Sequence, residues 1–198
     1  MRADYEEHKQ SQRVLKSLVD ERVKQATISK GVMIIYTGNG KGKTTAAMGT
    51  VIRAIGHGKK VGVVQFIKGK WENGEYNFLK AHNIDFFMMG TGFTWETQDR
   101  EKDTAAAEMV WKEAKRMLAD PTYDLVVMDE ITYMTAYHYI PLQELIASLQ
   151  SRPESQSVIL TGRDCHKKLM VLADTVTEMV ALKHGFDQGI KAQKGIDW

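Results

Sequence analysis

The sequence contains little cysteine and little proline, with one and three of these residues among 198. A single thiol, Cys165, cannot form a disulfide within the chain, which excludes a disulfide-stapled secreted domain and agrees with a reducing, cytoplasmic location. Long hydrophobic runs are also missing, because the apolar stretches extend over four to five residues, whereas a membrane helix needs roughly 20. No signal-type apolar segment follows Met1. The composition predicts a protein that neither crosses a membrane nor is exported.

A large excess of one charge is absent as well. The 27 Lys and Arg residues nearly balance the 25 Asp and Glu residues, which leaves a formal net charge of +2. A chain this close to neutrality is not expected to bind nucleic acid through a general electrostatic surface. Any anionic partner must therefore be held at a local site, on a chain whose length fits one ordinary domain.

Residues 1–30 are expected to form an N-terminal arm, and residues 31–198 the main domain. The apolar residues of the charged arm recur at helical spacing and predict an amphipathic helix. They are Val14, Leu15, Leu18, Val19 and Val23. Two interpretations stay open: the helix packs on its own domain, or it reaches over a site or a neighbouring subunit.

From Gly31 onward, short apolar runs alternate with helical patterns. The runs are VMIIYT, KVGVVQF, IDFFMM, YDLVVMDE, SVILTG and TVTEMV. Runs that are apolar on both faces and separated by helices are typical of a parallel sheet covered on both sides, so the predicted fold class is α/β. Ligands bind such sheets beyond the carboxyl ends of the strands. A site is therefore expected in segments 37–45, 67–76, 90–100, 129–139 and 161–166.

The segment TGNGKGKTT, residues 37–45, lies between a predicted strand and a predicted helix. Its glycines allow backbone N–H groups to turn inward, and the positive end of the helix points at the same place, which favours a polyphosphate. Lys43 would neutralise phosphate oxygens, and the Thr44 hydroxyl would bind Mg²⁺. The pattern differs from the usual phosphate loop in having Thr37 at the first glycine position. The residues expected to hold the nucleotide are Gly38, Asn39, Gly40, Lys41, Gly42, Lys43, Thr44 and Thr45.

Two carboxylates end the predicted strand in LVVMDE, residues 125–130. Mg²⁺ takes oxygen ligands and few protein groups, so Asp129 or Glu130 would supply one, directly or through water. The alternative is that the pair caps the helix that follows. Together the loop and the carboxylates predict nucleotide binding, although folds of this kind support many reactions.

The segment GTGFTWETQDR, residues 90–100, carries two aromatic rings, Phe93 and Trp95, two positions apart. In an extended loop both rings point the same way. They would line a flat apolar ligand, or they would pack beneath the loop.

The motifs TGNGKGKTTAA, GVVQFIKG, GTGFTWET, VVMDEITY and KHGFDQGIKAQKGIDW together resemble the ATP:corrinoid adenosyltransferases of cobalamin biosynthesis and salvage. The resemblance extends from about Val32 to Trp198 and includes the departure at Thr37. It implies a phosphate-loop, RecA-like fold and the transfer of the 5'-deoxyadenosyl group of ATP to the cobalt(I) of a corrinoid such as cobalamin or cobinamide, with release of triphosphate.

The same resemblance implies roles for particular residues. Lys43 and the loop would hold the triphosphate, and Thr44 with Glu130, next to Asp129, would organise Mg²⁺. Phe93 and Trp95 would lie against the corrin face opposite the attacking side. That apolar contact would exclude a lower axial ligand and make reduction to cobalt(I) feasible.

The resemblance further implies a homodimer, in which the arm closes over the neighbouring site, and a reduced flavoprotein such as flavodoxin as electron donor. Neither nucleic acid nor a membrane is an expected partner. Two other classes of function remain open on the residues alone. One is a phosphate-loop ATPase or kinase in which Glu130 orients a nucleophile, and the other is a corrinoid-binding chaperone that closes around its ligand when ATP binds.

The segment RDCHKKL, residues 163–169, gives three smaller expectations. Asp164 is predicted to be a helix N-cap, and Cys165 a packing residue. Arg163 would contact phosphate or form a surface salt bridge. The tail, residues 183–198, is expected to be ordered over a ligand because of the resemblance.

Overall fold

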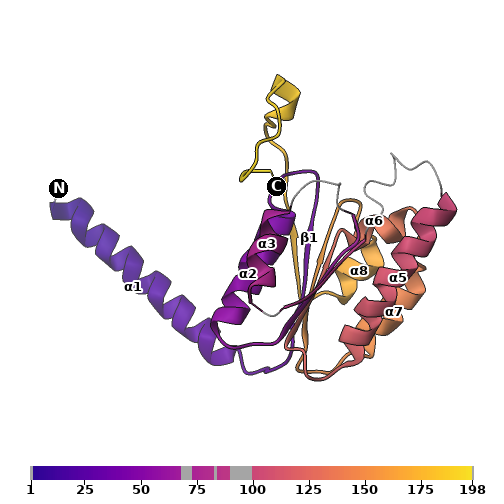
Figure 1. The fold of residues 1–198 in the computed structure, drawn as a ribbon. Helices are drawn as coiled ribbons and strands as arrows, with labels where there is room; N and C mark the ends of the chain where they lie inside the picture. Colours follow the sequence, from indigo (N-terminus) through magenta and orange to yellow (C-terminus); the bar gives the residue numbers. More distant parts are fainter. Residues whose placement is uncertain (1, 68–72, 83, 90–99, 198) are drawn as a thin grey trace.

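The computed structural model describes residues 2–67, 73–82, 84–89 and 100–197. In these residues a six-stranded parallel sheet is flanked by helices on both sides, as the apolar runs predict (Figure 1). The helices are α1 (Arg2–Gln25), α2 (Lys43–Gly56), α3 (Gly74–Lys80), α5 (Arg100–Ala119), α6 (Ile131–Ala136), α7 (Leu142–Gln150) and α8 (Lys167–Leu172), with the 3₁₀ helix η1 (Phe186–Gln188). The strands are β1 (Met33–Thr37), β2 (Val61–Gln65), β3 (Asp85–Met88), β4 (Leu125–Asp129), β5 (Ser157–Thr161) and β6 (Thr175–Glu178).

The strand order is β3-β2-β4-β5-β1-β6, so β1 and β4, the strands that lead to the glycine-rich loop and to the carboxylate pair, are separated only by β5. Every residue of β2 and β4 is buried, as expected for strands covered on both faces. The edge strands differ from that expectation, because β3 is only partly covered and all four residues of β6 are exposed.

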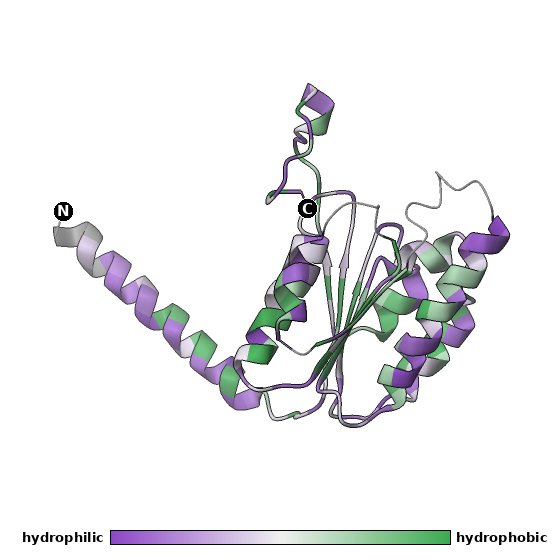
Figure 2. Ribbon diagram, in the orientation of Figure 1, coloured by the Kyte–Doolittle hydropathy of each residue, from purple (hydrophilic) through white to green (hydrophobic). Residues whose placement is uncertain are grey.

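Two hydrophobic cores hold the sheet between its helical layers. Helices α2 and α3 cover one face, where Ala47, Met48, Val51 and Leu79 pack against strand residues such as Val63. Helices α5 to α8 cover the other face through a larger core (Figure 1). Figure 2 shows hydrophobic residues along the central strands, and the helix residues that pack on them are hydrophobic as well. The packing fixes the carboxyl ends of the strands at one edge of the molecule.

Helix α1 projects away from the rest of the chain (Figure 1). The predicted helix is present. The residues of its apolar stripe, however, are each 49–67% exposed: Val14, Leu15, Leu18, Val19 and Val23. Hydrophobic and hydrophilic residues alternate along it (Figure 2). In this single chain the helix therefore does not pack on its own domain.

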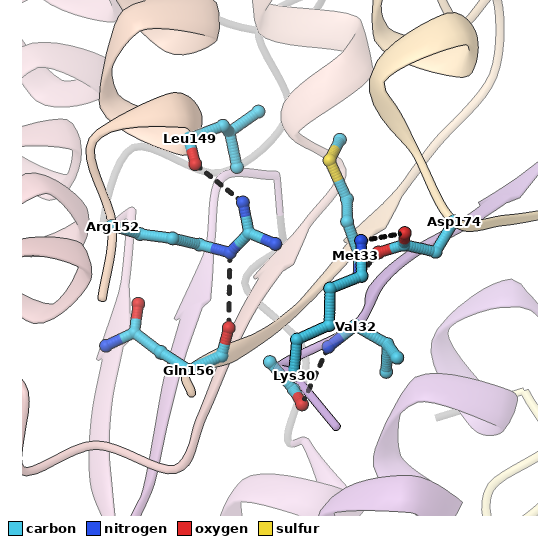
Figure 3. A network of polar contacts seen from close by, with 8 residues as sticks. Lys30, Val32, Met33, Leu149, Arg152, Gln156 and Asp174 are labelled. Carbon is cyan, nitrogen blue, oxygen red and sulfur yellow. Dashed lines mark hydrogen bonds and ion pairs between the residues drawn. The ribbon is translucent and has the colours of Figure 1, made fainter. Parts of the chain in front are cut away.

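The chain after α1 is fastened to the sheet at the amino ends of the strands. The Asp174 carboxylate accepts hydrogen bonds from Lys30 Nζ and from the Met33 backbone N–H, the latter at 2.8 Å (Figure 3). On the neighbouring turn, the Arg152 guanidinium donates to the carbonyl oxygens of Leu149 and Gln156 (Figure 3). These contacts lie at the end of the sheet opposite the glycine-rich loop. Among the described residues, no helix combines the length and apolar character needed to cross a membrane.

Candidate active site

The glycine-rich loop joins the end of β1 at Thr37 to the start of α2 at Lys43, as predicted. Gly42 occupies the N-cap position of α2 with φ of 106° and no side-chain cap, so the first N–H groups of the helix are open to a ligand. Gly38 has φ of 95°, and a Cβ atom there would lie 2.5 Å from the Met179 carbonyl oxygen. Both the backbone angle and the close approach require glycine.

Lys43 lies inside this loop and is only 7% exposed. Its ammonium donates hydrogen bonds to the carbonyl oxygens of Gly38 and Gly40, at 2.7 and 2.8 Å. Burial lowers the pKa of Lys43, and nearby Arg163 lowers it further, whereas the carboxylates of Glu130 and Asp129 oppose this shift. The charge is therefore held at the centre of the loop by backbone dipoles and two carboxylates.

Asp129 ends β4 with a fully buried carboxylate that only accepts hydrogen bonds. Its Oδ1 accepts from the hydroxyls of Thr44 and Thr161, at 2.9 and 2.6 Å. Its Oδ2 accepts from the amide Nε2 of Gln65, at 3.0 Å. These bonds place the predicted partners Thr44 and Asp129 together and account for the burial of the charge.

Glu130 follows in the left-handed region, with φ of 61°, and its backbone N–H donates to Thr161 Oγ1 at 2.9 Å. It stands at the N-cap of α6, but its side chain does not form a capping hydrogen bond. The alternative that this carboxylate serves as a helix cap is therefore wrong. Glu130 instead lines a pocket together with Lys43, Thr44 and Arg163.

This pocket has a volume of about 570 Å³, which is in the size range of small-molecule sites. It extends from the glycine-rich loop into the space between α2 and α3, and it reaches the C-terminal tail. It is lined by Asn39, Gly40, Lys41, Gly42, Lys43, Thr44, Thr45, Met48, Ile52, Gly74, Glu75, Phe78, Leu79, Glu130, Arg163, His184, Gly195, Ile196 and Asp197. The candidate nucleotide residues other than Gly38 line it directly.

The tail folds back onto the loop, in agreement with the expectation that it is ordered. Lys41 forms an ion pair with Asp197 of the tail. Between β6 and the tail, the carbonyl oxygen of Met179 accepts a hydrogen bond from the Gly40 N–H at 2.6 Å. In Figure 1 the tail rises beyond the sheet and returns toward the start of α2. The sequence contains no local signal for the role of Met179, because its carbonyl oxygen acts rather than its side chain.

The expectation that Asp164 caps a helix is wrong. Asp164 has φ of 52°, outside the extended conformation of an N-cap, and α8 begins three residues later at Lys167. His166 takes the cap position, and its Nδ1 accepts from the Lys168 backbone N–H at 3.1 Å. Cys165 is a packing residue, as expected. Its burial raises the pKa of the thiol to about 11.

Three polar residues near the site were not singled out by the sequence motifs: Gln65, Asn73 and Thr161. Gln65 and Thr161 are fully buried at the ends of β2 and β5. The available signal was a polar residue at the end of an otherwise apolar strand.

Phe93 and Trp95 lie outside the described residues. Arg53, on α2, is exposed.

Comparison with known proteins gives matches over most of the chain. Residues 29–198 match the family model described as ATP:corrinoid adenosyltransferase BtuR/CobO/CobP. The chain is similar to the corrinoid adenosyltransferase CobA of Salmonella typhimurium strain LT2, with 60% identity over 193 residues and coverage of 98% of both chains. It is also similar to the corrinoid adenosyltransferase of Escherichia coli strain K12, with 58% identity and the same coverage.

Among solved structures, the flagellar accessory protein FlaH from Methanocaldococcus jannaschii is similar with a TM-score of 0.52. The identity is 13%, and the similarity covers 76% of this chain and 72% of that one. At this identity the likeness concerns the fold alone.

Proposed function

The chain belongs to the ATP:corrinoid adenosyltransferase family, and from this membership we propose that it transfers the 5'-deoxyadenosyl group of ATP to the cobalt(I) of a corrinoid. The observation that carries the proposal is the pocket in which the loop, Lys43, Thr44 and Glu130 meet. A triphosphate fits the chemistry of its floor, where helix N–H groups and a buried ammonium converge.

The proposed reaction balances without a general base. The electron pair of cobalt(I) forms the new cobalt–carbon bond at C5', and the electrons of the broken carbon–oxygen bond leave with the triphosphate. Negative charge therefore grows on the departing oxygen. Lys43 and the N–H groups of the loop would stabilise that charge, and the buried ammonium and the uncapped start of α2 support this role.

The donor set also fits a magnesium ion. Thr44 donates its hydroxyl hydrogen to Asp129 Oδ1, so the lone pairs of Thr44 Oγ1 stay available, and Glu130 lines the same pocket. Among the residues described, no group of three or more His, Cys, Asp or Glu side chains could hold a metal alone. Phosphate oxygens and water would complete the coordination, as is usual for Mg²⁺. Bound there, Mg²⁺ would neutralise charge on the leaving triphosphate.

We assign Phe93 and Trp95 to the corrin floor on the basis of the family resemblance. We expect Trp95→Ala to leave ATP affinity unchanged and to lower adenosylation of cobalt(II) corrinoids when a mild reductant supplies the electron. Prereduced cobalt(I) substrate is the control, since it bypasses the reduction that the ring assists. Equal rates of the variant and the wild type with cobalt(II) would remove this role.

The proposal further includes a cytoplasmic homodimer that receives electrons from a reduced flavoprotein such as flavodoxin. The family resemblance supports these assignments, and the exposed apolar stripe of α1 supports a contact with another subunit.

The experiment that tests the function uses purified protein, ATP, Mg²⁺ and prereduced cob(I)alamin under anaerobic conditions. The visible spectrum and the phosphate product are followed together. We expect a light-sensitive alkylcobalamin and one triphosphate for each cobalt–carbon bond. ADP with unchanged corrinoid would indicate an ATPase or kinase instead, and tight corrinoid binding without a new bond would indicate a chaperone.

A further inference from the structure

A chain of three hydrogen bonds runs from the start of α3 to the Asp129 carboxylate. The Tyr76 backbone N–H donates to Asn73 Oδ1 at 3.1 Å, which makes Asn73 the N-cap of α3. Asn73 Nδ2 donates to Gln65 Oε1 at 2.7 Å. Gln65 Nε2 donates to Asp129 Oδ2 at 3.0 Å. These residues come from three separate segments, and their side chains meet at the carboxyl ends of β2 and β4.

The donor-to-acceptor direction of this chain of hydrogen bonds is fixed at both ends. An ionised Asp129 can only accept hydrogen bonds, so the amide nitrogen of Gln65 faces it. At the other end the Tyr76 N–H can only donate, so the amide oxygen of Asn73 faces α3. Gln65 is fully buried and Asn73 is 8% exposed, so water competes little for these groups. Both amides are held in one orientation.

We propose that Gln65 and Asn73 are positioning residues for the metal and the nucleotide. Gln65 holds Oδ2 of Asp129, which directs Oδ1 toward the Thr44 hydroxyl and leaves the lone pairs of Thr44 facing the pocket. Asn73 fixes the orientation of Gln65. The inference rests on the proposed function, because it takes Thr44 to be a metal ligand.

The same chain of hydrogen bonds connects the side of the pocket that would hold the metal to the opposite wall of the pocket. Asn73 caps α3, whose residues Gly74, Glu75 and Phe78 line the pocket. A displacement of α3 by the nucleotide would therefore alter the hydrogen bond on Gln65 and, through it, Asp129. Partners of metal ligands set metal affinity in this way, and their loss typically costs about 10- to 100-fold.

Asn73→Asp separates positioning from capping. The new carboxylate keeps an acceptor for the Tyr76 N–H and is itself a favoured N-cap, so α3 is preserved. It places an acceptor opposite Gln65 Oε1, and Gln65 must turn its amide to donate. An amide oxygen then faces Asp129 Oδ2, and the carboxylate loses a donor. Asn77→Asp is the matched control, because it adds the same charge at an exposed position on the same helix.

Binding of Mn²⁺ to the ATP complex, followed by the loss of the free-ion EPR signal, measures the effect without turnover. We expect Asn73→Asp to raise the dissociation constant for Mn²⁺ about tenfold. ATP affinity in EDTA should change little, the melting temperature of the free protein should fall by a few degrees because the buried Asp129 carboxylate loses a hydrogen bond, and Asn77→Asp should match the wild type. The steady-state Mg²⁺ requirement should rise with kcat at saturating Mg²⁺ retained.

Gln65→Met provides the second test, because it removes both hydrogen bonds of the amide with little change in side-chain length. It should also weaken Mn²⁺ binding, and adding Asn73→Asp to it should have little further effect, since Asn73 acts through Gln65. Unchanged Mn²⁺ affinity in Asn73→Asp, or effects of the two substitutions that multiply, would overturn the proposal. Wild-type protein that forms no cobalt–carbon bond would reject the proposed function, while the Mn²⁺ measurements would still decide the positioning role.

Discussion

At the scale of single residues, the site places one buried cation among acceptors before any ligand arrives. Lys43 donates to two carbonyl oxygens of its own loop, and an ammonium carries three N–H donors. A phosphate oxygen can therefore bind the same group without displacing these bonds. The loop is organised around the charge, and binding requires little rearrangement.

Substitution Lys43→Met should show the contribution of that charge. Hydrogen bonds to charged groups contribute about 1.5–3 kcal/mol, so we expect ATP to bind at least tenfold more weakly in calorimetric titrations with Mg²⁺. Lys59→Met is the control, because Lys59 pairs with Asp124 away from the pocket. Equal ATP affinity in Lys43→Met and the wild type would show that the ammonium does not contact the triphosphate.

At the scale of elements, the local pattern predicts the strands and the glycine-rich loop correctly. Apolar runs and positive-φ glycines determine the backbone structure within a few residues of their own positions. The strand order and the contacts of Asp129 were not predictable in this way. Gln65 and Thr161 reach that carboxylate from sequence separations of 64 and 32, and only the packed sheet brings them together. The prediction that Asp164 is an N-cap is wrong because an acidic residue before a helix fits a cap in sequence, whereas the backbone conformation of Asp164 does not.

The turn after β5 approaches the turn after β4 closely at Gly162. Gly162 has φ of +137°, and a Cβ atom there would lie 2.2 Å from Thr132 Oγ1 and 3.1 Å from Glu130 Oε2. We expect Gly162→Ala to lower the free energy of unfolding in urea by about 2–4 kcal/mol, from backbone strain and overpacking together.

Gly58→Ala gives a reference for backbone strain without a steric contact, at a positive φ that L residues adopt more readily than the φ of Gly162. Gly58 also has a positive φ, +69°, but a Cβ atom there would meet nothing within 4 Å. It should lose only the backbone contribution, about 1 kcal/mol. If both variants lose the same stability, the contact between the two turns does not constrain the site.

At the scale of the whole molecule, helix α1 projects away from the packed sheet, and each residue of its apolar stripe is 49–67% exposed (Figure 1). An exposed row of five valine and leucine side chains gains stability by contact with another surface. From the family resemblance we propose that this surface belongs to a neighbouring subunit.

Deletion of residues 1–25 should therefore leave the urea stability of the sheet domain within about 0.5 kcal/mol, as for other exposed positions. It should weaken ATP or corrinoid binding by the assembled protein, measured by titration alongside sedimentation to determine oligomeric state. Val14→Ser with Leu18→Ser tests the stripe while keeping the helix length. Unchanged affinities would place the arm outside the site, and a large loss of stability would mean that the arm packs on its own domain in solution.

The contact between Gly40 and Met179 has a consequence for synthesis of the protein. Translation proceeds from the amino terminus, so the glycine-rich loop leaves the ribosome long before β6 and Met179, which complete its hydrogen bonding. A chain that is still being translated therefore lacks the completed loop that would bind ATP. We therefore expect the nucleotide to stabilise the released protein but not a ribosome-bound intermediate that ends before β6.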